Sequence, residues 1–143
     1  MNTNPATPGK ENVNGARRQG KIMIMDDDEM VRTIAEAMLI HLGYESELAA
    51  DGEEAVGLYR TALPAGTEAD LIIMDLAIPG GMGGEVAVKE ILALNPEAKV
   101  LVSSGYTDDP IMADYTAYGF CGAIAKPYQI QEFYTTIQEV LYP

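Results

Sequence analysis

Short apolar runs alternate with segments of helical periodicity from residue 21 onward, and this alternation constrains the fold more than any other feature. The runs that we interpret as strands are KIMIM (21–25), YESELAA (44–50), DLIIMD (70–75), AKVLVSS (98–104) and CGAIAK (121–126). Three of them are nearly continuous in apolar residues, which is typical of parallel strands that are covered on both faces. Residues 44–50 alternate instead, so we predict that they form an edge strand.

The segments that separate or follow these runs each place apolar residues on one side of a helix. The predicted helices cover residues 31–42, 52–63, 84–94, 110–118 and 130–141. Asp51 and the pair Asp109–Pro110 are typical of helix starts, and Gly43 and Gly119 are typical of helix ends. Five strands alternating with five helices indicate an α/β fold: a doubly wound parallel sheet with right-handed crossovers and helices on both faces.

The composition supports one folded domain with an acidic surface. The 143 residues are 48% apolar, enough for one core, whereas residues 1–20 are rich in Asn, Pro, Gly and Thr and are predicted to be a disordered tail or linker before a domain over residues 21–143. Asp and Glu total 22 against 9 Lys and Arg, for a net charge of −13. This balance argues against binding to nucleic acid or an anionic membrane surface and favours cations as ligands.

Two further features indicate the cytoplasm. The chain has a single cysteine, Cys121, which fits a reducing compartment. Its sequence contains no apolar run that approaches the roughly 20 residues of a membrane span, and its N-terminus has no signal-peptide core.

Charged and hydroxyl side chains stand at the carboxyl ends of four predicted strands. Asp26 and Asp27 follow the first strand, Asp75 ends the third, Ser103 and Ser104 end the fourth, and Lys126 ends the fifth. In doubly wound sheets ligands bind beyond these ends, so we expect the side chains to converge on one rim. Clustered carboxylates repel one another unless a cation neutralises them, which predicts a divalent metal at this rim.

Each of these residues also has a simpler interpretation. An acid after a strand is commonly the N-cap of the next helix, and Asp27 or Asp28 could have that role. A cap explains one acid but not three. The joint placement of the residues therefore favours a functional site over separate solvated loop residues.

Four sequence blocks resemble the signature blocks of the bacterial response-regulator receiver domain of two-component signalling. They are IMDDDEMVR, LIIMDLAIPGGMGG, VLVSSGYTDDP and AIAKPY, and the resemblance covers residues 21–142. The residues of these blocks are most similar to those of receivers at the C-terminus of hybrid sensor histidine kinases. The resemblance implies a flavodoxin-like strand order 2-1-3-4-5. It also implies that the chain is a phosphoacceptor domain of a phosphorelay. Such a domain is not an enzyme in the usual sense, because it catalyses only its own phosphorylation and dephosphorylation.

The resemblance assigns roles to the acids at the rim. It implies that Asp75 takes a phosphoryl group from a phosphohistidine of a histidine kinase or phosphotransfer domain. It further implies that Asp27 and Asp75 bind Mg²⁺ directly, that Asp26 binds it directly or through water, and that the carbonyl oxygen of Ala77 completes the protein ligands. This chemistry is consistent with the oxygen ligands and retained waters that Mg²⁺ prefers.

The resemblance also assigns the remaining rim residues. It implies that Lys126 neutralises charge on the phosphoryl group, that Ser104 donates its hydroxyl to a phosphoryl oxygen, and that the Lys126–Pro127 bond is cis. One position departs from the family pattern: many receivers carry Tyr or Phe three residues before the lysine, and this chain has Ala123. An aromatic side chain that reports phosphorylation is therefore not expected at this position.

Two other functional classes share part of this residue pattern. A haloacid-dehalogenase-like phosphatase would use Asp26 and Asp28 as a D-x-D motif, but Met30 stands where that motif requires Thr or Val, and the chain lacks a cap domain. A pseudo-receiver that binds partners without phosphorylation would normally have lost an acid or the lysine, and all are present.

The position of the C-terminus leaves the context of the receiver open. The sequence ends at Pro143, so we expect no effector domain after the last helix. The protein would then act through its own surface as a stand-alone receiver, as a phosphate relay or sink, or as a fragment of a longer kinase. A homodimer is also left open.

Overall fold

The computed structural model describes residues 20–143, so the predicted disordered tail lies, except for Gly20, outside the described residues. The chain forms one sheet from strands β1 (Lys21–Met25), β2 (Glu45–Ala49), β3 (Leu71–Asp75), β4 (Val100–Ser104) and β5 (Gly122–Ala125). All neighbouring strands are parallel and their order is β2-β1-β3-β4-β5. This confirms the predicted fold class, the strand order and the edge position of the second strand.

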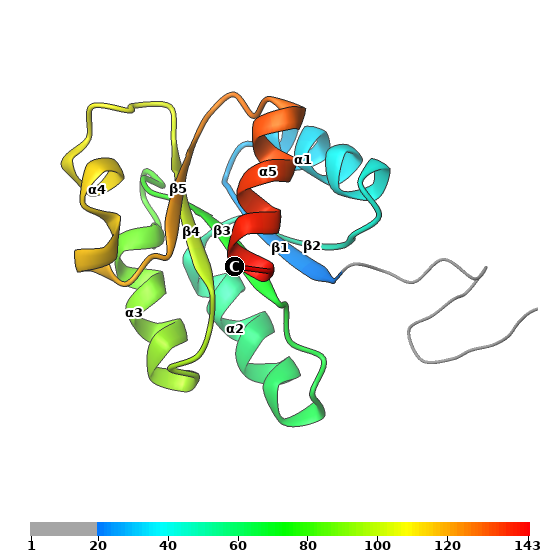
Figure 1. Cartoon of the computed structure of the whole chain (residues 1–143). Coiled ribbons are helices and arrows are strands. Elements are labelled where there is room, and N and C mark those ends of the chain that lie inside the picture. Colours follow the sequence, from blue (N-terminus) through cyan, green and yellow to red (C-terminus); the bar gives the residue numbers. More distant parts are fainter. Residues whose placement is uncertain (1–19) are drawn as a thin grey trace, which may run out of the picture.

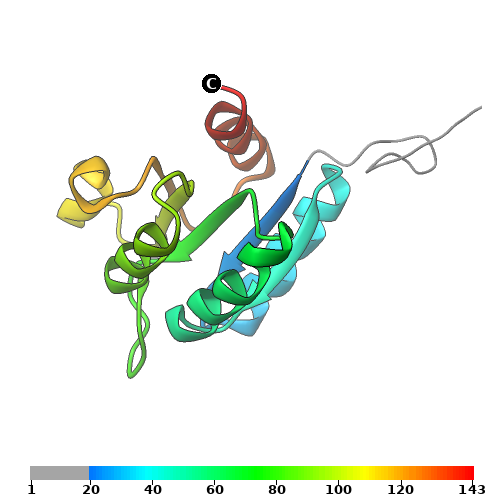
Figure 2. The ribbon, with the colours of Figure 1, turned by 90° about the horizontal axis from the view of Figure 1, so that it is seen from below.

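Helices cover both faces of the sheet (Figures 1 and 2). They are α1 (Glu29–His41), α2 (Gly52–Ala62), α3 (Gly84–Leu94), α4 (Pro110–Ala113) and α5 (Ile130–Leu141), with short 3-10 helices η1 (Leu63–Ala65) and η2 (Tyr115–Tyr118). Helices α1 and α5 pack on one face, and α2 and α3 pack on the other. Within residues 20–143, none of the helices combines the length and the apolar content that crossing a membrane would require.

The two cores follow from the alternation of side chains along the strands. On the α1/α5 face, Ile73 of β3 belongs to the same buried cluster as Leu39 and Phe133. On the α2/α3 face, Ile72 belongs to a second cluster with Val56. Because every residue of β3 and β4 is buried, the central strands are nearly continuous in apolar residues, as the sequence pattern indicated.

Side-chain caps fix where helices begin at the carboxyl edge of the sheet. The carboxylate of Asp28 accepts a hydrogen bond from the Met30 N–H at 2.9 Å, and that of Asp51 accepts from the Glu54 N–H at 2.9 Å. Asp109 caps α4 in the same way. These caps satisfy N–H groups that have no partner inside a helix. The starts of α1, α2 and α4 are thus set by acids in the loops after β1, β2 and β4.

The predicted helix over residues 110–118 is wrong in its continuity, although its start and end are correct. Asp114 leaves the helical region with φ −117° and ψ 45°, so the segment divides into α4 and the 3-10 helix η2. The residues after Asp114 include tyrosines and Thr116, whose side chains lose rotamer freedom in a helix. Gly119, with φ 98°, then ends the segment.

Candidate functional site

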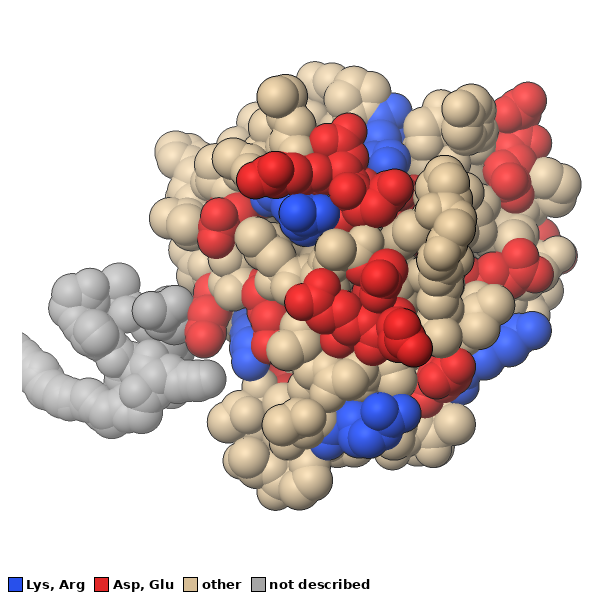
Figure 3. Space-filling view, turned by 180° about the vertical axis from the view of Figure 1, so that it is seen from behind, with Lys and Arg blue, Asp and Glu red and all other residues tan. Residues whose placement is uncertain are grey.

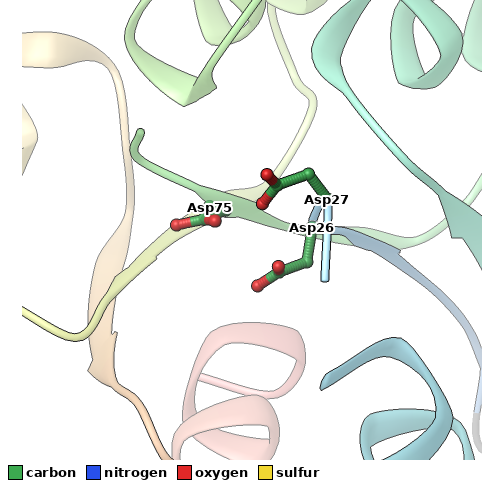
Figure 4. Close-up of side chains that lie close together, drawn as sticks. All are labelled: Asp26, Asp27 and Asp75. Atoms are coloured by element: carbon green, nitrogen blue, oxygen red, sulfur yellow. The ribbon is translucent and has the colours of Figure 1, made fainter. Parts of the chain in front are cut away.

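Three carboxylates meet at the carboxyl edge of the sheet (Figure 4). Asp26 and Asp27 follow β1, and Asp75 is the last residue of β3, the strand that pairs with β1. One oxygen from each acid lies within 4.8 Å of the others. The structure thus brings together the three acids that the sequence analysis placed on one rim.

Lys126 enters this cluster from the end of β5. Its Nζ lies 2.8 Å from Oδ2 of Asp26 and 3.2 Å from Oδ2 of Asp75. The other oxygen of Asp26 accepts a hydrogen bond from the Asp28 N–H at 2.9 Å. Both oxygens of the fully buried Asp26 therefore have protein donors.

The environment of the cluster shifts the pKa values of Asp75 and Lys126. Burial, together with the nearby charge of Asp26, raises the pKa of Asp75 to about 6, although Lys126 lowers it. Burial alone would lower the pKa of Lys126, but Asp26 and Asp75 hold it above its usual value. At neutral pH Lys126 is therefore charged, and Asp75 is largely an ionised carboxylate that the fold holds at some cost.

The other predicted site residues lie around this cluster. Ser104 is 4% exposed, and its hydroxyl oxygen accepts a hydrogen bond from the Tyr106 N–H at 2.9 Å. The backbone carbonyl of Ser104 accepts from the Lys126 N–H at 2.9 Å, which joins the ends of β4 and β5. Ala77 is exposed in the loop after β3, two residues beyond Asp75. The Lys126–Pro127 bond is cis, as the resemblance implied.

The donor set suits magnesium. Three carboxylates offer oxygen ligands to a hard cation, and the exposed position of Asp27 leaves room for the waters that Mg²⁺ retains. Asp28 is not part of this cluster, because its carboxylate caps α1. Asp28, the second acid of the D-x-D motif, therefore caps a helix, and this removes the main support for the phosphatase alternative.

Sequence reasoning missed two polar contacts near the site. The Arg32 side chain of α1 donates from Nη1 to the backbone carbonyl of Asp26 at 2.8 Å and so holds the loop that carries two acids. The Tyr128 hydroxyl donates to the hydroxyl oxygen of Ser103 at 3.0 Å. Two sequence features could have pointed to these contacts: Arg32, six residues after Asp26, and the serine pair at the end of β4. Neither feature indicates which group it would contact.

Comparison with known proteins places the chain in a family. The model of the family described as "Response regulator receiver domain" matches residues 22–138. Chemotaxis protein CheY of Thermotoga maritima is 31% identical over 110 residues, which cover 76% of this chain and 87% of that protein. The chain therefore belongs to the response-regulator receiver domain family. It is a phosphoacceptor-type signalling domain, and the phosphatase and pseudo-receiver alternatives are not favoured.

Two further relatives illustrate the settings in which such domains occur. Sensor kinase CckA of Brucella abortus is 28% identical over 120 residues, and the match covers 84% of this chain but only 12% of that protein. The receiver domain of a sensor histidine kinase from Pseudomonas aeruginosa, solved with a magnesium ion in its active site cleft, superposes with a TM-score of 0.75 at 25% identity. That similarity covers 87% of this chain and 98% of the other. Both fit the resemblance to receivers of hybrid kinases.

Proposed function

We propose that Asp75 is the residue that accepts the phosphoryl group, from a phosphohistidine of a histidine kinase or phosphotransfer protein. In this transfer the bond from phosphorus to the histidine nitrogen breaks, the nitrogen keeps the electron pair, and a bond from phosphorus to an Asp75 oxygen forms. The observation that carries the proposal is the convergence of Asp75 with two further acids and Lys126 at one strand edge.

The charge state of Asp75 suits a nucleophile. Because its pKa is about 6, the carboxylate is largely ionised at neutral pH and has a free electron pair for attack. Lys126 lies within hydrogen-bond distance of Asp75, so its ammonium group can neutralise charge on the oxygens of the transferred phosphoryl group. Ser104, at the end of β4, supplies a hydroxyl to another of these oxygens. Phosphoryl transfer depends mainly on this kind of positioning and charge neutralisation.

The acids would hold Mg²⁺ in unequal ways. Asp27 and Asp75 would be the direct ligands, and the carbonyl of Ala77 would complete the protein donors. Asp26 is better suited to contact through water, because its two oxygens already accept from Lys126 and from the Asp28 N–H. When bound, Mg²⁺ supplies positive charge against the acids and the phosphoryl oxygens.

The partners are proteins rather than nucleic acids or membranes. The net charge is −13, and Figure 3 shows a face on which Asp and Glu side chains form several groups, with Lys and Arg side chains beside some of them. We place the protein in the cytoplasm, a reducing compartment that suits its single cysteine, Cys121. Its catalysis is restricted to its own phosphorylation and dephosphorylation.

Labelling with a small phosphodonor tests the assignment of Asp75. Incubation with acetyl phosphate and Mg²⁺ should add one phosphoryl group, detected by intact mass, and alkaline pH should remove it, as for an acyl phosphate. Asp75→Asn should abolish the label. The control is Asp28→Asn, which makes the same chemical change in a neighbouring loop and keeps a side chain that caps helices equally well. Equal labelling of wild type and Asp75→Asn would exclude the assignment.

A further inference from the structure

Two hydroxyl groups are buried together beside the site. Ser103 is fully buried in β4, and Tyr128, 7% exposed, lies in the loop between β5 and α5. The Tyr128 hydroxyl donates to the Ser103 hydroxyl oxygen at 3.0 Å. Burying hydroxyl groups without a partner is costly, so each depends on the other. Such a bond also fixes direction and distance, which a contact between two apolar side chains would not.

The sheet register places this pair on the same face as the charged residues. Side chains alternate along a strand, and Ile73 and Leu101 face α1 and α5. Two residues further along, Asp75 and Ser103 therefore face the same side, and they are direct partners in the pairing of β3 with β4. The carbonyl of Ser103 also accepts from the Leu76 N–H at 2.9 Å, so Ser103 holds the backbone just after Asp75.

Tyr128 connects this strand to the loop that carries the lysine. It stands two residues after Lys126, and its ring packs against Phe133 of α5 with ring centroids 4.8 Å apart. The ring anchors the residue in the core, and the hydroxyl ties it to β4. The bond thus links two parts of the site that are separate in sequence: the loop of Lys126 and the strand that ends in Ser104.

We propose that Tyr128 is a positioning residue for phosphorylation, which acts through its hydrogen bond to Ser103 to hold Lys126 and Ser104 in register with Asp75. Tyr128 does not touch the reacting atoms in this arrangement. Its loss should reduce the rate of phosphoryl transfer while the acids that bind the metal keep their places. The inference rests on the proposed function, because it assumes that Asp75 is the phosphoacceptor.

Tyr128→Phe is the direct test, since it removes the hydroxyl and keeps the ring against Phe133. The rate of labelling by acetyl phosphate is followed by intact mass at a series of Mg²⁺ concentrations. We expect the maximal rate to fall about tenfold, because small displacements of positioned groups reduce rates strongly. The Mg²⁺ concentration at half-maximal rate should stay unchanged. Ser103→Ala should give the same loss, and the double variant should be no slower than either single variant.

Tyr59→Phe is the matched control. Tyr59 is 2% exposed, and its hydroxyl accepts a hydrogen bond from the Asn95 side chain at 2.9 Å in the core on the opposite face of the sheet. The Tyr59→Phe variant should have a lower thermal midpoint than the wild type and the same rate of labelling.

Three results would overturn the inference: a wild-type rate in Tyr128→Phe, an equal slowing in Tyr59→Phe, or additive losses in the double variant. If Asp75→Asn is still labelled, the proposed function itself fails. If it is not labelled and Tyr128→Phe reacts like the wild type, only the role of Tyr128 is wrong.

Discussion

Replacing Asp75 with Asn should stabilise the metal-free protein, because it removes a charge that the fold holds at a cost. Asp75 is 6% exposed, and burial, with the charge of Asp26, raises its pKa from 3.8 to about 6. The gap between these values corresponds to about 3 kcal/mol of unfolding free energy at a pH where the carboxylate is ionised in both states. Asn resembles the protonated side chain, so near pH 8 the variant should gain an amount of this order.

The pH dependence of this gain has a defined sign. Between pH 3.8 and about 6, Asp75 is protonated to a larger extent in the folded protein than in the unfolded chain, because its pKa is higher in the folded protein. The wild type therefore recovers stability relative to Asp75→Asn as the pH falls through about 6, and the difference should vanish below 3.8. Urea unfolding followed by circular dichroism, with a chelator present, measures the difference at each pH.

The control separates this local effect from the overall negative charge. Asp28→Asn also removes one negative charge but leaves the cluster of three acids intact. It should change stability much less than Asp75→Asn. An Asp75→Asn variant that is no more stable than the wild type near pH 8 would refute the reasoning. A gain of equal size in Asp28→Asn would assign the effect to net charge instead.

Four other perturbations have expected outcomes. Millimolar Mg²⁺ should raise the thermal midpoint of the wild type and have no effect on Asp27→Ala, because a metal bound only by the folded state stabilises it by mass action; a wild type that ignores Mg²⁺ would contradict this. In α2, Gly52→Ala should cost about 1–3 kcal/mol in urea unfolding, since its Cβ would meet a backbone carbonyl oxygen of the β3–α3 loop at 2.7 Å. Gly57→Ala, with open space around it, should instead gain about 0.5–1 kcal/mol. Beryllofluoride, a mimic of the phosphoryl group, should shift the NMR signals of backbone amides near Tyr106, which is 74% exposed. The signals near Ala123 should stay almost unchanged, since alanine has no side-chain rotamer to switch. Large shifts near Ala123 with none near Tyr106 would contradict this prediction.

The sequence was sufficient to predict the acids of the site because their placement depends on the fold alone. Parallel strands end at one edge of the sheet, so identifying the strands that precede Asp26 and end in Asp75 was enough to bring these residues together. The convergence of Lys126 followed in the same way from the end of β5. For these residues the side-chain contacts confirm a prediction made from strand ends.

The contacts that sequence reasoning missed depend on loop paths and on competition between local structures. The bond between Tyr128 and Ser103 joins a loop to a strand, and no periodicity specifies how a loop after β5 folds back. The break at Asp114 depends on residues of weak helix propensity, where tertiary contacts decide the outcome. The same applies to Asp28, which could have faced the cluster but caps α1.

The unequal contacts of Lys126 are consistent with the phosphoryl transfer that we propose. Nζ lies 2.8 Å from Asp26 and 3.2 Å from Asp75. If Asp75 accepts a phosphoryl group, as proposed, its carboxylate charge would be lost, and negative charge would appear on the phosphoryl oxygens further from the backbone. A lysine paired only with Asp75 would lose its partner at that moment. Asp26 is fully buried and also held by the Asp28 N–H. Under the proposed function it would keep the ammonium group in place while Lys126 exchanged an Asp75 oxygen for a phosphoryl oxygen.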